Sequence, residues 1–170
     1  MYRVLLAVSD DDGQAREQAD FVASLPGTDE LDVTVTHAYD ESGERDPHGD
    51  PLPPEESTGV QAARARLAEA GLTVETRETY QPVAEGIVDL AADIDADLVV
   101  VGARKRTPIG KAVFGSVTQS VVLDSPVPVT VVAVDREEAR VRGDLSTGDT
   151  VIALGTHLLA PGMRVREQRP

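Results

Sequence analysis

Three short stretches of almost purely apolar residues constrain the fold of this chain most strongly. They are YRVLLAV at residues 2–8, DLVVV at residues 97–101 and VPVTVVAV at residues 127–134. Each is short and is bounded by turn residues, which is typical of a strand buried on both faces. Strands of this kind occur in parallel sheets that are covered by helices on both sides, so the sequence predicts an α/β fold.

Segments with helical periodicity separate these strands, and two further strands are indicated by β-branched residues. Crossovers between parallel strands are right-handed, so we expect an open, doubly wound sheet of five parallel strands. Such sheets bind ligands beyond the carboxyl ends of their strands, which directs attention to the loops after Val8 and Val101. The predicted helices cover residues 14–25, 61–70, 82–91 and 116–123, and the two further strands cover residues 32–39 and 72–80.

The charge balance excludes several classes of protein. The chain has 30 acidic and 16 basic residues, a net charge of −14, and no cysteine. Such a surface repels nucleic acid and anionic membranes, and no apolar run approaches the roughly 20 residues that cross a bilayer. We therefore expect a cytoplasmic protein with no structural metal that binds neither nucleic acid nor membrane. The excess of acids over lysines favours a salt-adapted source over an ordinary acidic protein.

Two stretches depart from the alternation of strands and helices. Residues 40–59 hold four prolines, three glycines and seven acids, a composition that predicts a mobile loop. Residues 1–135 carry 25 acids and 10 bases, whereas residues 136–170 carry 5 acids and 6 bases. We therefore predict a domain of residues 1–135 and a C-terminal extension of residues 136–170, whose role stays open. Within the extension, residues 150–154 and 163–166 indicate either a β-hairpin or a flexible tail.

The segment with the most chemical information is VVVGARKRTPIGKAVFGSVTQSVV, residues 99–122. Gly102 ends a buried strand, and Gly115 and Ser116 open a helix thirteen residues later. Glycine lets a ligand approach the main chain, and the first amides of a helix attract anions. Ser116 is also a suitable N-cap whose hydroxyl can donate to a phosphate oxygen. Four of the sixteen bases lie between the glycines, at Arg104, Lys105, Arg106 and Lys111. The segment therefore predicts an anion site, unless these bases are only a solvated patch that offsets the surrounding acids.

Other phosphate-binding motifs are absent from this segment. Gly110 and Lys111 are not part of a Walker A loop, because Lys105 stands where that motif needs glycine and Ala112 where it needs Ser or Thr. Ser116 has no neighbouring Asp–His pair or nucleophile-elbow sequence, so we assign no catalytic residue.

Acids and histidines outside the segment are weaker candidates. Asp10, Asp11 and Asp12 could hold the Mg²⁺ of a bound nucleotide, or form an ordinary acidic turn, and Asp10 is the better candidate of the three. The histidines share no metal-ligand spacing, so we expect structural or solvated roles for them. They are His37, His48 and His157.

The spacing of the glycines resembles the motif G-x2-G-x9-G-[ST] of the universal stress protein family. Gly102, Gly115 and Ser116 occupy matching positions. The opening YRVLLAVSD is similar to the family's Y-x-x-I-L-V-A-V-D, and YQPVAEGIVDLAADIDADLVVVG is similar to the family's G-x-P-x-x-x-I stretch before the fourth strand. The resemblance covers residues 2–134 and implies the adenine nucleotide alpha hydrolase-like fold, with strand order 3-2-1-4-5.

This sequence departs from the family pattern at three places. Lys105 replaces the second glycine of the motif, so its side chain either blocks the phosphates or binds them with its charge. The aspartate that ends the family's first strand falls on Ser9 or Asp10. Tyr80 replaces the opening glycine before the fourth strand.

In ATP-binding members of the family, the motif wraps the triphosphate and ribose. The resemblance therefore implies a stress-response regulator that binds ATP, with Mg²⁺ as its companion ion. Phosphates would lie at the glycines and at the first amides of the helix, the ribose or a metal ion at the end of the first strand, and adenine at the end of the second. The implied binding residues are Val8, Ser9, Asp10, Ala38, Gly102, Arg104, Lys105, Gly115, Ser116 and Val117.

The last predicted strand, from Val127 to Val134, would lie at the edge of the sheet. Exposed edges invite pairing, and the dimers of the family use this strand, so the resemblance implies a homodimer. Alternatively, the C-terminal extension covers the edge. Two other functions stay open. One is a nucleotide-free dimeric scaffold, and the other is a slow ATP-hydrolysing enzyme, for which Asp10, Asp11 and Asp12 are the only evident general bases.

Overall fold

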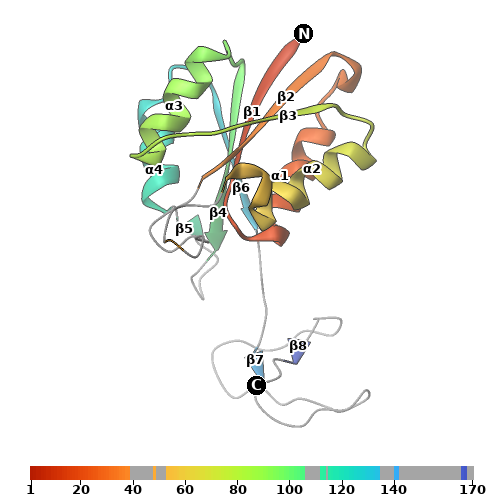
Figure 1. The fold of residues 1–170 in the computed structure, drawn as a ribbon, viewed down its shortest axis with the longest axis vertical. Helices are drawn as coiled ribbons and strands as arrows, with labels where there is room; N and C mark the ends of the chain where they lie inside the picture. The colour runs from red at the N-terminus through yellow and green to blue at the C-terminus, as the bar shows by residue number, and fades with distance from the viewer. Residues whose placement is uncertain are drawn as a thin grey trace.

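A central parallel sheet between two layers of helices forms the main body of the protein (Figure 1). The computed structural model describes residues 1–38, 48, 53–105, 112–113, 115–134, 140–141 and 166–167. The strands of the sheet lie in the order β3-β2-β1-β4-β6, and all neighbours in this series are parallel. The predicted five-stranded sheet of order 3-2-1-4-5 is therefore confirmed, with β6 as its fifth strand. Its strands are β1 (Tyr2–Val8), β2 (Leu31–His37), β3 (Val74–Arg77), β4 (Leu98–Lys105) and β6 (Val129–Val134).

Helices cover both faces of this sheet, with α1 and α2 on one side and α3 and α4 on the other (Figure 1). Short 3-10 turns precede β2 and α2. The helices are α1 (Asp12–Ala23), α2 (Thr58–Glu69), α3 (Val83–Asp93) and α4 (Ser116–Asp124), and the 3-10 turns are η1 (Thr28–Glu30) and η2 (Pro54–Glu56).

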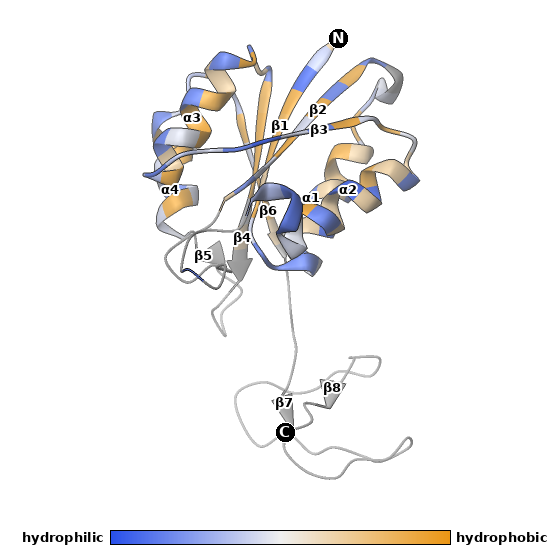
Figure 2. Ribbon diagram, in the orientation of Figure 1, coloured by the Kyte–Doolittle hydropathy of each residue, from blue (hydrophilic) through white to orange (hydrophobic). Residues whose placement is uncertain are grey.

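The continuous apolar character of β1 follows from its central place in the sheet. Val4, Leu6 and Val8 pack in the core beneath α1 and α2, whereas Leu5 and Ala7 pack in the core beneath α3 and α4. All five side chains are buried, so alternation of polar and apolar residues is absent. Figure 2 shows mostly apolar residues along β1, between helices that carry both hydrophobic and hydrophilic residues.

Three element boundaries differ from the sequence-based expectation. β4 continues through Lys105, where we expected a loop after Val101, and β5 (Ala112–Val113) pairs with its end in antiparallel fashion. α2 begins at Thr58, inside the predicted loop of residues 40–59, because Ser57 provides a side-chain cap. β3 has only four residues, because the chain leaves the sheet after Arg77.

In the C-terminal extension the structure describes two short strands. β7 (Arg140–Val141) and β8 (Arg166–Glu167) pair in parallel. Of the segments predicted to form a hairpin, residues 150–154 and 163–165 lie outside the described residues, and Arg166 belongs to β8. None of the helices that the structure describes has the length and apolar character that a bilayer crossing requires.

Candidate functional site

The candidate site is the edge of the sheet where the carboxyl ends of β1, β2 and β4 meet. Val8 pairs with His37 and Ala7 pairs with Val101, so the residues that follow these positions lie close together. β2 and β3 extend from one side of β1, and β4 and β6 extend from the other. The winding therefore reverses between β1 and β4, which is where open α/β sheets bind ligands.

The antiparallel pair of β4 and β5 lies over this switch point. Lys105 pairs with Ala112, and Arg104 pairs with Val113 on one side and with Val134 of β6 on the other. Because β6 occupies one side of β4, β5 lies on the side that β1 occupies nearer the start of β4. β5 is thus placed beyond the carboxyl end of β1. The predicted basic side chains of this segment, those of Arg104, Lys105, Arg106 and Lys111, lie outside the part of the chain that the structure describes.

The N-terminus of α4 is open. Gly115 is its N-cap, with φ −66° and ψ 163°, and makes no capping hydrogen bond through a side chain. We expected Ser116 to be the cap, but it is the first helical residue, because the extended backbone that an N-cap requires occurs at Gly115. Gly115 and Ser116 are both exposed, and a Cβ added at Gly115 would meet none of the described residues within 4 Å. The amides of the first turn therefore have no capping side chain from the N-cap residue, which is the condition for binding an anion.

A hydrogen bond joins this helix end to β4. Thr118, in the first turn of α4, donates from Oγ1 to the carbonyl oxygen of Gly102 at 2.7 Å, and Thr118 is itself buried. The structure thus brings together the two glycine positions, Gly102 and Gly115, that are thirteen residues apart in the sequence.

The turn after β1 is held by internal contacts. Asp11 caps α1 by accepting a hydrogen bond from the Gln14 amide at 2.9 Å. Oδ1 of Asp10 lies 2.7 Å from Nε2 of His37 and accepts a hydrogen bond from Ser57 Oγ at 3.0 Å. His37 is 1% exposed, so it has the structural role that we predicted for it. The Asp10 carboxylate is therefore bound to the protein on the α2 side, and is not simply an acid that faces solvent.

The first turn of α2 packs directly on this turn. Thr58 Oγ1 donates to the Asp10 carbonyl oxygen at 2.7 Å. Gly59 is buried, and a Cβ added there would lie 1.7 Å from the Ser9 carbonyl oxygen. Only glycine fits at position 59. Neither Ser57 nor Gly59 was a candidate from the sequence, although a serine before a helix is the usual signal of an N-cap.

The end of β2 forms the third side of the site. The Ala38 amide donates to the Val8 carbonyl oxygen at 2.7 Å, and Ala38 is half-buried against the core beneath α3 and α4. Thr79 Oγ1 donates to the His37 carbonyl oxygen at 3.2 Å, which draws the chain after β3 toward this corner. Tyr80, which stands where the family has glycine, has its hydroxyl hydrogen-bonded to Asp89 of α3. Ala38, Val8 and the adjacent Ser9 are therefore neighbours, as the resemblance implied.

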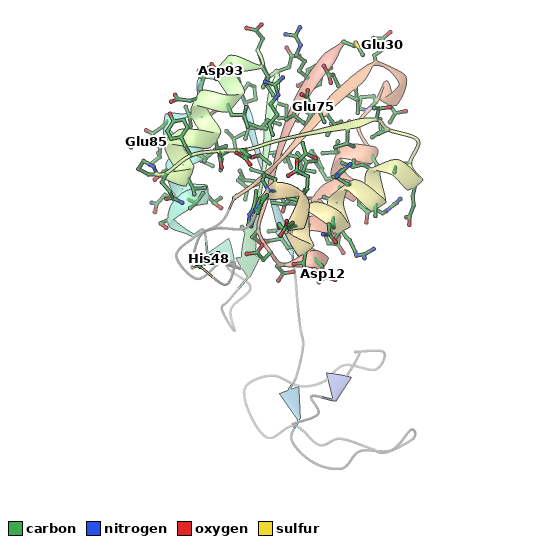
Figure 3. The ribbon with its side chains drawn as sticks, in the orientation of Figure 1. Asp12, Glu30, His48, Glu75, Glu85 and Asp93 are labelled. Carbon is green, nitrogen blue, oxygen red and sulfur yellow. The ribbon has the colours of Figure 1, made fainter. Side chains whose placement is uncertain are left out.

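Acidic residues are distributed over the whole domain. Figure 3 shows Asp12 near the end at which the strands of the sheet finish and Glu30 near the opposite end, with Glu75, Glu85 and Asp93 elsewhere on the surface. Among the described residues, no three His, Asp or Glu side chains gather in the manner of a metal site.

Comparison with known proteins agrees with this arrangement. The sequence model of the Universal stress protein family matches residues 1–133. A universal stress protein of Synechocystis sp. is 28% identical over 135 residues, which are 78% of this chain and 86% of that protein. The structure of a universal stress protein from Archaeoglobus fulgidus superposes with a TM-score of 0.61 at 27% identity and covers 77% of this chain and 98% of that one. A universal stress protein from Archaeoglobus fulgidus in complex with dAMP superposes with a TM-score of 0.58 at 24% identity, over 77% of this chain and 97% of that one.

Proposed function

Since the chain belongs to the universal stress protein family, we propose that it binds an adenine nucleotide, ATP with Mg²⁺, at the carboxyl edge of its sheet and acts as a homodimeric stress-response regulator. The observation that carries this proposal is the open N-terminus of α4. It starts at a glycine with no side-chain cap, and its first turn is hydrogen-bonded to the switch-point strand at Gly102. On a protein of net charge −14, a helix end of this kind is a favourable place for phosphate.

In this proposal each side of the site has its own task. The amides of Ser116 and Val117, with the backbone at Gly102 and Gly115, bind the phosphates, and the Ser116 hydroxyl donates to one of their oxygens. Arg104 and Lys105 neutralise the phosphate charge. Ser9 contacts the ribose, Asp10 fixes the turn that carries Ser9, and Val8 and Ala38 flank the adenine.

The fold of related proteins supports an adenine nucleotide as ligand. The Archaeoglobus protein whose structure contains dAMP has the same arrangement of strands and helices. dAMP has a base, a sugar and a phosphate, which correspond to the three sides of the site described above. ATP adds two phosphates, for which the free amides and the basic segment of residues 104–111 provide the complementary charge. Mg²⁺ would then be held chiefly by the phosphates of the nucleotide, as is common for this ion.

Calorimetric titration tests the proposal directly. Purified protein is titrated with ATP·Mg²⁺, ADP and AMP, in a salt concentration at which circular dichroism shows it to be folded. We expect saturable binding that becomes tighter with the number of phosphates. Absence of binding up to millimolar concentrations of all three nucleotides would refute it and would leave a nucleotide-free scaffold as the function.

Substitution of Lys105 separates two versions of the site. If the lysine replaces a close backbone contact with charge, Lys105→Gly weakens ATP binding but changes the binding of adenosine little. Tighter ATP binding in Lys105→Gly would show instead that the lysine obstructs the phosphates. Arg64→Ala is the control. Arg64 lies on the exposed face of α2, so this substitution removes a positive charge outside the proposed site without the helix disruption that Arg64→Gly would cause.

The edge position of β6 supports the proposed homodimer. Among the described strands β6 pairs only with β4, and Val129, Thr130 and Val131 are half-buried in the single chain. On the neighbouring helix, Val122 is 45% exposed and Leu123 is 75% exposed. An apolar edge of this kind is a pairing surface, and a two-fold dimer closes it. We expect a dimer in light scattering, and Val131→Lys to convert it to a monomer. A monomeric wild-type protein would refute this part of the proposal.

A further inference from the structure

Two glutamines of α1 are buried beneath the candidate site. Gln14 is 5% exposed and Gln18 is 0% exposed, and they lie four residues apart on one face of the helix. Residues with this spacing on a helix are neighbours. Burial of an amide is unfavourable unless it is hydrogen-bonded, and an apolar side chain is the usual choice where a helix faces a sheet. The two amides therefore require a specific explanation.

Both glutamines bind the end of β1. Ser9 Oγ donates to Gln14 Oε1 at 3.2 Å, and Gln18 Nε2 donates to the Ala7 carbonyl oxygen at 3.0 Å. Gln14 also has its backbone amide bound by the Asp11 cap, which fixes the start of the helix that carries it. The Ser9 side chain is thus oriented from α1.

The same two side chains pack against β4 at Gly102. A Cβ added at Gly102 would lie 2.6 Å from Cδ and 2.7 Å from Nε2 of Gln14, and 2.9 Å from Oε1 of Gln18. The space that a side chain at position 102 would need is therefore filled by the two amides. In addition, the Gly102 carbonyl oxygen accepts the hydrogen bond from Thr118. Gly102 is held between α1 and α4.

We propose that Gln14 and Gln18 are positioning residues of the nucleotide site, which set the separation between Ser9 on the β1 side and Gly102 on the β4 side. This inference rests on the proposed function, because it assigns those two residues to ribose and phosphate. It gives a physical reason for glycine at position 102 that is separate from contact with a ligand. The glycine admits the glutamine amides from α1, and these amides tie together the two strands between which the winding reverses.

The test replaces the Gln14 amide and keeps the length of the side chain. Gln14→Met removes the acceptor for Ser9 but fills a similar volume. Gln61→Met, at an exposed position of α2 where the amide donates to the Glu55 carbonyl oxygen, is the control for loss of a glutamine amide that does not contact Ser9 or Gly102. Affinities for ATP and for adenosine are measured by calorimetry, and folding by thermal unfolding. We expect the ATP affinity of Gln14→Met to fall about tenfold, with a smaller change for adenosine, because ATP spans the distance from Ser9 to Gly102 whereas adenosine reaches only the Ser9 side. Equal losses for the two ligands, or no loss, would overturn the positioning role.

A second experiment tests the packing itself and needs no nucleotide. In thermal unfolding of the full chain, Gly102→Ala is compared in the wild-type background and in the Gln14→Ala background. We expect Gly102→Ala to lower Tm in the wild type, where the buried Gln14 amide must shift, and to lower it less in the Gln14→Ala protein, since the shortened side chain at position 14 makes room. Strictly additive shifts in Tm would show that Gln14 does not occupy the space beside Gly102 and would overturn the inference.

The two experiments distinguish this inference from the proposed function. If the wild-type protein binds neither ATP nor adenosine, the proposed function is refuted before any variant is considered. If the wild type binds ATP and Gln14→Met binds it equally well, the proposed function holds and the positioning role is wrong.

Discussion

The turn after β1 and the start of α4 lie at the same edge of the sheet but are built in opposite ways. Around the β1 turn, two helix N-termini are capped by side chains, α1 by Asp11 and α2 by Ser57. Asp10 is bound to His37 and Ser57, and Gly59 brings α2 into contact with Ser9. The start of α4 has a glycine as its cap and no side-chain cap, and none of the described residues lies within 4 Å of a Cβ built at Gly115.

This difference shows which part of the edge can still bind an anion. Helix amides attract phosphate only while no side chain satisfies them. The acidic run of residues 10–12 attracts attention in the sequence, yet two of its carboxylates already serve the protein, one as a helix cap and one as the partner of buried His37. The proposed function therefore places the phosphates at α4, whereas the contacts of the β1 turn are structural.

The largest difference in stability that we expect is between alanine substitutions of Gly59, beside the β1 turn, and of Gly115, at the start of α4. Gly59→Ala places a Cβ 1.7 Å from the Ser9 carbonyl oxygen, so α2 must move away from the turn. We expect a loss of about 3–5 kcal/mol in the free energy of unfolding, the range of severe packing defects. Urea denaturation followed by circular dichroism measures it.

Gly115→Ala is the control for this substitution. Its backbone angles suit any residue, and no described residue lies within 4 Å of the added Cβ. We therefore expect a cost of about 1 kcal/mol, from the preference of N-caps against alanine. If Gly59→Ala were as stable as Gly115→Ala, the claim that α2 packs on the β1 turn too closely for a Cβ would be refuted.

An aspartate at position 115 would give the start of α4 a side-chain cap, as the helices around the β1 turn already have. Gly115→Asp supplies α4 with the kind of cap that Asp11 gives to α1, so the stability of the fold is unchanged or slightly higher. At the same time its carboxylate competes with phosphate for the amides and repels it. We expect ATP affinity to fall by at least about thirtyfold, roughly 2 kcal/mol, in calorimetry.

Gly115→Asn separates the two causes of this loss, because it caps the helix without a charge. Its ATP affinity should lie between those of the wild type and Gly115→Asp. Unchanged ATP binding in Gly115→Asp would place the phosphates elsewhere, even if the protein binds nucleotide.

The sheet could be predicted from the sequence because its strands are buried on both faces. YRVLLAV and DLVVV have no polar alternation, and residues of β1 are indeed shared between two cores. The spacing from Gly102 to Gly115 likewise placed a helix start correctly, although β4 runs three residues past Gly102. These features are local or periodic, so the order of residues is sufficient to specify them.

The contacts around the turn after β1 could not be predicted in the same way. His37, Ser57 and Asp10 come from three separate parts of the chain, and only the fold brings them together. Gly59 lay in a stretch whose proline and acid content predicted a loop, and the contact that requires glycine is to Ser9, far earlier in the chain. Gln14 and Gln18 have an i, i+4 spacing, but polar residues at that spacing more often mark the exposed face of a helix.

The smallest expected effects come from two serines, Ser57 beside the β1 turn and Ser116 at the start of α4, which should affect stability and ATP affinity separately. Ser57 is buried, donates to Asp10 and caps α2, so Ser57→Ala removes a cap and leaves a carboxylate with one partner fewer. We expect a loss of about 1 kcal/mol in the free energy of unfolding, with ATP affinity nearly unchanged. Ser116→Ala, at an exposed first-turn position that is not the N-cap, should have the opposite profile, with stability within about 0.5 kcal/mol of wild type and weaker ATP binding. Urea denaturation measures the stability of the two variants, and calorimetry measures their ATP affinity. If both substitutions changed stability and neither changed ATP affinity, the start of α4 would have a structural role only and no role in binding.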